Sequence, residues 1–159
     1  MKLAQYALAV VLLLAGAAAA QAPVARSTGQ MLYLPIYSHV WHGDLDSRGE
    51  PAKALVSVSV SIRNTDPARA IRVLSAQYYD TDGKRLREYV VAPRIVQPMA
   101  TFELFIPRKD DTGGSGANFV IVWKADVLTS PPIVEGFHAN MPVGRSIAFT
   151  TTARPIPSE

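Results

Sequence analysis

The sequence predicts an all-β protein, folded as a single antiparallel β-sandwich of roughly immunoglobulin-like architecture with about eight short strands. Three observations predict this fold. Valine and isoleucine alternate with serine and arginine over 55–63, the period of a strand with one dry face and one wet face. Residues 71–91 read as two strands around a glycine turn. Beyond the N-terminal apolar stretch, no ten residues combine helical periodicity with caps.

The first 20 residues have the pattern of a secretory signal peptide. Lys2 supplies a positive charge, an apolar stretch follows, and the small residues of 16–20 end it. We predict cleavage after Ala20, a periplasmic or secreted mature protein, and no membrane span after cleavage. An uncleaved membrane anchor is the alternative, because the stretch approaches the ~20 residues that span a bilayer.

The remaining chain has the length of one domain. We expect a linker over 21–30, the sandwich over 31–152, and a flexible tail over 153–159, which contains two prolines. The absence of cysteine excludes disulfides and the acylated cysteine of a bacterial lipoprotein. The net charge of +3 is scattered along the chain, which argues against nucleic acid as a partner.

The predicted strands follow one another with turn residues between them. As extended chain, 32–41 places its aromatic residues and His39 on one face and its aliphatic residues on the other. After the strand at 55–63, a polar turn with Pro67 leads to the hairpin at 71–91. In 71–79, the apolar residues fall on two faces: Ile71 and Val73 on one; Leu74, Ala76 and Tyr78 on the other.

Four further strands complete the sandwich. Alternation predicts a strand over 101–106, with Phe102, Leu104 and Ile106 on one side. The almost wholly apolar run 118–124 indicates a central strand buried on both faces. Strands over 133–139 and 143–151 follow. Glycines at 113–116 predict a sharp bend into the central strand.

Two segments are candidates for ligand binding, an aromatic strand-and-loop and a glycine-rich loop. Their candidate residues are Tyr33, Tyr37, His39, Trp41, His42, Asp44, Gly113, Gly114, Ser115 and Asn118. The aromatic face could stack on a sugar or grip a peptide. The alternative is that the aromatic strand covers part of the core or its edge.

Metal binding through His39 and His42 is a weaker alternative. A spacing of three places the two imidazoles on opposite faces of a strand unless the chain turns at Gly43. A zinc site also needs three or four ligands, and His138 is the remaining histidine. No cofactor is predicted.

Catalysis has little support in the sequence. The segment 113–117 is a loose variant of the serine nucleophile elbow, but a strand rather than a helix follows it. Glu135 and His138 fall on opposite faces of their predicted strand. No catalytic residue is therefore predicted, and an enzyme is not favoured.

The pattern of motifs resembles a family of short exported bacterial proteins known only as a domain of unknown function. The motifs, in order, are Tyr33-x-Pro35-x-Tyr37-Ser38-His39, Ser61 to Asp66, Tyr78 to Gly83, Gly113 to Phe119 and Pro132 to Glu135. The resemblance spans about 29–151 and implies bacterial origin, export and a single domain. Some relatives look like lipoproteins, and this chain departs from them in lacking the cysteine.

We expect a non-catalytic binding module of the cell envelope, whose partner is a protein or a glycan. Polar, glycine-rich loops on a rigid sandwich are common binding elements. The alternative to such a module, besides the metal-binding protein, is an envelope structural or assembly factor. Such a factor would bind by adding a strand at an exposed sheet edge.

Overall fold

The protein is all-β. The computed structural model describes residues 25–157, so the predicted signal peptide at 1–20 lies outside the described residues. Twelve strands, all paired antiparallel, form three sheets, which confirms the predicted fold class with more strands than expected. Within 25–157 no helix is long and apolar enough to cross a membrane.

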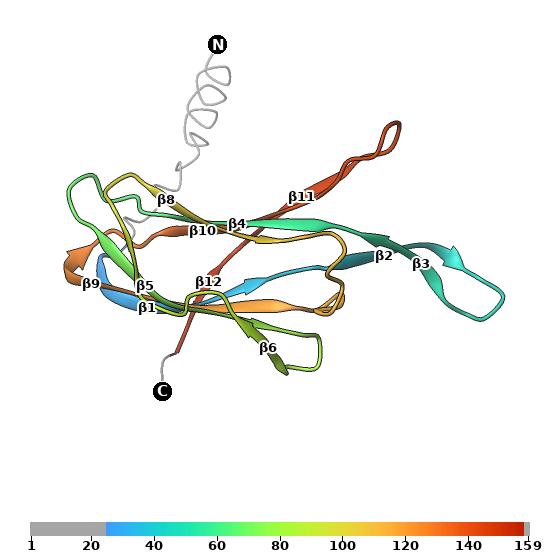
Figure 1. Cartoon of the computed structure of the whole chain (residues 1–159), viewed down its shortest axis with the longest axis horizontal. Coiled ribbons are helices and arrows are strands. Elements are labelled where there is room, and N and C mark those ends of the chain that lie inside the picture. Colours follow the sequence, from blue (N-terminus) through green and yellow to red (C-terminus); the bar gives the residue numbers. More distant parts are fainter. Residues whose placement is uncertain (1–24, 158–159) are drawn as a thin grey trace, which may run out of the picture.

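Two sheets face each other and the third projects from them (Figure 1). The first has the order β12-β1-β9-β5-β6, with β7 also paired to β5, and the second has the order β11-β10-β4-β8. The first contains β1 (Ser27–Pro35), β5 (Ile71–Tyr79), β6 (Arg85–Glu88), β7 (Arg94–Val96), β9 (Asn118–Thr129) and β12 (Arg154–Ile156). The second contains β4 (Ser57–Arg63), β8 (Thr101–Ile106), β10 (Ile133–Asn140) and β11 (Ile147–Thr152). The third is the pair β2 (His39–Leu45) and β3 (Pro51–Leu55).

The core lies between the first two sheets and follows the predicted alternation. In β4, Val58, Val60 and Ile62 are fully buried, while between them Ser59 is half-buried and Ser61 is 7% exposed. Leu104 and Ile106 of β8 are buried beside them. The largest fully buried side chains of the opposing sheet are Trp123, Tyr78, Phe119, Leu34, Ile71 and Ile121. Burying such side chains supplies the main driving force for folding, roughly 1.5–3 kcal/mol each.

A β-bulge explains why the apolar residues of β5 fall on two opposite faces in the sequence pattern. Val73 pairs with Trp123 and Ser75 with Val122, so Leu74 is an extra residue without a partner. The extra residue shifts the side-chain phase by one. As a result Ile71 and Val73 before the bulge and Ala76 and Tyr78 after it all point into the core, whereas Leu74 itself stays only half-buried.

Strand β9 is central, as predicted, but it is not buried on both faces. Phe119, Ile121 and Trp123 are completely buried, whereas Val120 and Val122 are only half-buried. The reason is that no further layer covers the outer face of the first sheet in the described residues.

The two ends of the described chain pair with each other. β1 begins at Ser27, inside the segment expected to be a linker, and pairs with β9. Residues 154–156, expected in the flexible tail, form β12 and pair with β1 from Met31 to Tyr33. Pro155 is compatible with this position because β12 is an edge strand.

One end of the sandwich is closed by a buried polar network at the predicted turn after β4. The Asn64 amide donates to the backbone carbonyls of Arg69, Val96 and Gln97 at 2.8–3.0 Å. Asp66 accepts from the backbone N–H groups of Ala68, Arg69 and Ser130. These donors outweigh desolvation and lower the pKa of Asp66. These hydrogen bonds therefore hold the turns at this end of the sandwich together, and the opposite end carries the projecting elements.

Candidate functional site

The third sheet is a hairpin that projects past the end of the sandwich, and we call residues 39–55 the hairpin arm (Figure 1). Its turn is organised by Asp46, whose carboxylate accepts from the backbone N–H groups of Arg48 and Glu50 at 2.8 and 3.0 Å. These bonds lower the pKa of Asp46. Gly49 takes the positive φ that the turn requires.

The base of the hairpin arm is attached to the glycine-rich loop that precedes β9. Ile36 N–H donates to the Ala117 carbonyl at 2.8 Å, and Ser38 N–H donates to the Gly114 carbonyl at 2.9 Å. Lys53 forms a 2.8 Å ion pair with Asp111 of the same loop. The two segments predicted as binding elements therefore meet at one end of the molecule.

The glycine-rich loop is rigidly held by its neighbours. Gly113 lies so close to Tyr78 that an added Cβ would overlap the tyrosine hydroxyl, and Gly114 has φ +78°. The Thr81 hydroxyl donates to the Gly113 carbonyl and accepts from Gly116 N–H, each at 3.0 Å. The glycines thus serve a sharp bend against the β5–β6 turn, as predicted.

His39 is the buried polar group at the base of the hairpin arm. It is 6% exposed and packs edge-on against Trp41, with ring centroids 4.7 Å apart. Neither ring nitrogen has a hydrogen-bond partner within residues 25–157. Burial, reinforced by the positive charge of Lys53, lowers the pKa of His39 below its usual 6.5, so the ring is neutral at pH 7. Trp41 is 50% exposed and presents its outer edge to solvent.

Tyr37 belongs to a different cluster, under the start of β11. Its backbone N–H donates to His138 Nε2 at 3.1 Å, and His138 Nδ1 lies 3.0 Å from the Gly136 carbonyl. The acceptor role of Nε2 places the proton on Nδ1, which donates to that carbonyl. Phe149 stacks on the imidazole at 4.5 Å. His138 is a structural residue with both nitrogens satisfied.

The structure does not place the predicted aromatic residues on one face. Tyr33 lies on the outside of β1, Tyr37 packs under β11, and Trp41 lies on the hairpin arm. The extended chain is interrupted at 36–38, where backbone hydrogen bonds turn it out of the first sheet and into the third. The prediction of one continuous aromatic face was therefore wrong.

The remaining candidate residues are dispersed. His42 pairs with Ala52 and points to the face opposite His39, because no turn separates the two histidines. Asp44 lies in the bulge of β2 and lines an open hollow of about 470 Å³ beside Trp41. Asn118 opens β9 and pairs with Pro35 and Tyr79. Ser115 stays in the glycine-rich loop. No group of three or more His, Cys, Asp or Glu side chains in the described part of the chain could hold a metal ion.

Sequence reasoning missed a second projecting element, the loop 141–146 between β10 and β11, which we call the second arm. It extends from the same end as the hairpin arm (Figure 1). Met141 is 63% exposed and Val143 is fully exposed. The apolar turn Met141-Pro142-Val143-Gly144 was the available signal, because proline and glycine predict a turn and turns lie mostly on the surface.

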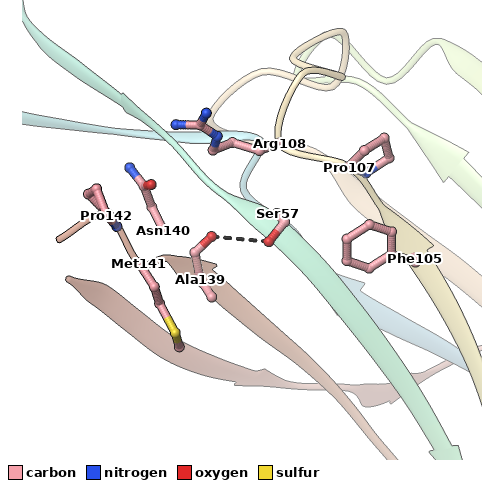
Figure 2. Close-up of a pocket in the computed structure, with 8 residues that line it drawn as sticks. All are labelled: Ser57, Phe105, Pro107, Arg108, Ala139, Asn140, Met141 and Pro142. Atoms are coloured by element: carbon pink, nitrogen blue, oxygen red, sulfur yellow. Dashed lines mark hydrogen bonds between the residues drawn. The ribbon is translucent and has the colours of Figure 1, made fainter.

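A hollow of about 510 Å³ lies at the base of the second arm, on the outer face of the second sheet (Figure 2). Its lining residues are Ser57, Phe105, Pro107, Arg108, Ala139, Asn140, Met141 and Pro142. The Ser57 hydroxyl donates to the Ala139 carbonyl at 3.1 Å across its floor. Phe105 and Met141 line it from opposite sides and leave it largely apolar.

The comparisons with known proteins identify a family whose function is unknown. A family model described as "Protein of unknown function (DUF3124)" matches residues 29–156. Among solved structures, one described as "Crystal Structure of Thermotoga maritima 1070" is similar, with a TM-score of 0.44 and 12% identity. The similarity covers 79% of this chain and 92% of that chain. No curated protein shows a significant match.

Proposed function

The chain belongs to the DUF3124 family of proteins of unknown function, and we propose that it is an exported, non-catalytic module that binds a protein of the cell envelope. The two arms at one end of the sandwich would grip that partner. Export is supported by the pattern of residues 1–20, a positive charge followed by an apolar stretch and small residues.

The observation that carries the proposal is the exposure of apolar side chains on both arms. On the hairpin arm, Leu45 is 68% exposed and Trp41 is half exposed. On the second arm, Met141 is 63% exposed and Val143 is fully exposed. Exposed apolar side chains grouped at one end of a molecule mark protein interaction sites. Tryptophan and methionine are also enriched in the centres of such interfaces.

The attachment of the hairpin arm supports the same role. Backbone hydrogen bonds from Ile36 and Ser38, together with the Lys53–Asp111 ion pair, fix the arm to the loop before β9. A rigid arm loses little conformational entropy when it binds, which leaves more of the contact energy for affinity. The apolar hollow beside Met141 offers a recess for a side chain of the partner.

A protein partner fits these arms better than a glycan does. Sugar-binding surfaces combine aromatic faces with polar groups that bond the sugar hydroxyls. Here the exposed side chains on the second arm are aliphatic, and Trp41 has its partner His39 packed against it. The apolar character of both arms therefore favours a protein surface.

Site-specific photocrosslinking in living cells tests the proposal. A photoreactive residue replaces Leu45 or Val143 in turn, and Val91 or Ile95, which are exposed apolar residues elsewhere, in the controls. We expect the same protein adduct from both arms and none from the controls. Leu45→Asp should then abolish the adduct formed from position 143, whereas Val91→Asp should leave it unchanged. Adducts that form equally from the control positions, or from neither arm, would contradict the proposal.

A further inference from the structure

The edge strands of the two facing sheets differ in how they are protected against pairing with other chains. Natural edge strands carry charges, prolines or bulges that prevent such pairing. The edges of the first sheet are β12, β6 and β7, and those of the second are β8 and β11. The protective residues are Arg154 and Pro155 in β12, Arg85 and Arg87 in β6, Arg94 in β7, and Glu103 in β8.

Strand β11 carries none of these devices. Its sequence from Ile147 to Thr152 is Ile-Ala-Phe-Thr-Thr-Thr, without charge, proline or glycine. It pairs with β10 in unbroken register over six residues, so no bulge twists it away. Ala148, Thr150 and Thr152 are exposed. Among the edges of these two sheets in the described residues, β11 alone is regular and uncharged.

The backbone of β11 has free hydrogen-bonding groups in a regular row. Ala153 N–H donates to the Val134 carbonyl, which makes these two residues a hydrogen-bonded pair. Such pairs alternate along an antiparallel ladder, so Thr151, Phe149 and Ile147 face β10 with their backbone groups. The backbone N–H and C=O groups of Ala148, Thr150 and Thr152 therefore point to the open edge.

We propose that two copies of this chain pair through β11, antiparallel about a twofold axis, to join their second sheets into one of eight strands. With Thr150 opposite Thr150 of the second copy, each Ala148 faces a Thr152. These residues are small or β-branched, and Thr–Thr pairs are favourable neighbours across strands. A closed twofold interface requires a surface that is complementary to itself, which this uncharged strand provides.

The charges around β11 favour self-pairing of two copies through this strand over self-pairing through β8. In the register centred on Thr150, Arg154 falls opposite Ser146 of the second copy and Arg145 falls opposite Pro155, so no charge lies directly opposite a like charge. Self-pairing of β8 would instead bring Glu103 close to Glu103 of the second copy in the centred register. Like charges placed opposite each other destabilise a strand pair.

A charge-swap experiment tests this pairing in the purified protein. We expect the wild type to be a dimer by multi-angle light scattering. Thr150→Lys and Thr150→Glu should each be monomeric, because each places two like charges across the axis. Mixing the two variants should restore a dimer containing one copy of each. Thr101→Lys, at an exposed threonine on the opposite edge of the same sheet, should remain dimeric.

A second measurement tests the same pairing if a charged variant folds poorly. Because the chain has no cysteine, Thr150→Cys introduces a single labelling site. A spin label there should show strong coupling between copies, and one at Thr101→Cys should not. A wild-type protein that is monomeric at every concentration measured, or a dimer that persists in both charge variants with native circular dichroism, would overturn the proposal. The arm crosslinks described above do not depend on this edge, so the two proposals fail separately.

Discussion

His138 shows how a buried polar residue can be satisfied without being a site. Its imidazole is completely buried, its Nε2 accepts from Tyr37 N–H, and its Nδ1 donates to the Gly136 carbonyl. Burial is the dominant cause that lowers its pKa below 6.5. Because the protonated ring would lose the bond from Tyr37, the folded state favours the neutral form.

The stability of the protein should therefore fall as the pH drops below about 6.5. In the unfolded chain His138 binds a proton near its usual pKa of 6.5, whereas in the folded protein it binds one only at lower pH. The free energy of unfolding then decreases by at most about 1.4 kcal/mol per pH unit for each such histidine. Urea denaturation between ~pH 5 and 8 measures this slope.

His138→Gln provides the matched comparison, since glutamine can accept and donate at the same positions without titrating. We expect a less stable protein whose pH dependence is flatter below 6.5. His39→Gln should also flatten the profile, because the pKa of His39 is lowered as well. An equal slope in wild type and His138→Gln would show that His138 does not contribute.

At the scale of single residues, sequence patterns predicted burial well and proximity poorly. The alternation around Val58 and Val60 predicted which side chains enter the core, because burial of one strand face leaves a period of two. The contact between Ile36 and Ala117 could not be predicted, since it is a backbone hydrogen bond that any side chains permit. The side-chain pattern of the two candidate segments therefore did not predict that they meet.

At the scale of elements, length decided what could be predicted. The hairpin of β5 and β6 was predicted because β5 has nine residues and the turn contains Gly83, which has the expected positive φ. β7 and β12 have three residues each, too few to show a period. In the hairpin arm, β2 is exposed over most of its length and β3 has no buried residue, so neither strand shows the buried face of a sandwich strand. The residues of the second arm from Val143 onward were assigned to the following strand because they are partly apolar.

The bulge in β5 allows a test of how the sequence determines which side chains of a strand face the core. Deleting Leu74 removes the unpaired residue and leaves Ile71, Val73, Ala76 and Tyr78 in simple alternation. We expect this variant to fold, with a loss of roughly 1–2 kcal/mol from the missing half-buried side chain. Deleting Ser59 from β4, which has no bulge, should instead turn one half of that strand inside out and prevent folding.

Circular dichroism and urea denaturation of the two deletion variants measure the difference. Both variants lack one residue from a strand of a facing sheet, so chain length is matched between them. Equal damage from the two deletions would mean that the bulge is required for a reason other than the phase of the side chains.

At the scale of the whole molecule, the two ends of the sandwich have different characters. The end at Asn64 and Asp66 is closed by buried polar side chains that tie three turns together. The opposite end carries both arms and the apolar hollow. Because of this asymmetry, substitutions on the arms can alter binding without disturbing the hydrogen bonds that stabilise the end at Asn64 and Asp66.

The crossing from β11 to β12 connects the two facing sheets through the chain itself. β11 lies in the second sheet, Ala153 packs against the core, and β12 lies in the first sheet beside β1. A chain ending at Ala153 should lose about 2–4 kcal/mol of stability, from three strand pairs and the half-buried Ile156. Urea denaturation and amide hydrogen exchange of β1 measure this loss.

Arg154→Ala in the full chain is the control for the truncation, because this side chain is exposed. Its stability should stay within about 0.5 kcal/mol of the wild type. A truncated chain as stable as the wild type would show that β12 adds nothing to the first sheet.

The pairing of β1 with both β9 and β12 has a consequence for how the protein matures. Strand β1 emerges from the ribosome well before its two neighbours, because β9 and β12 lie far downstream at 118–129 and 154–156. The nascent polypeptide therefore has no way to complete its first sheet early, and its folding is slow by topology. Under the proposed export, this delay would keep the chain unfolded enough to pass through a translocation pore until β9 and β12 have been synthesised.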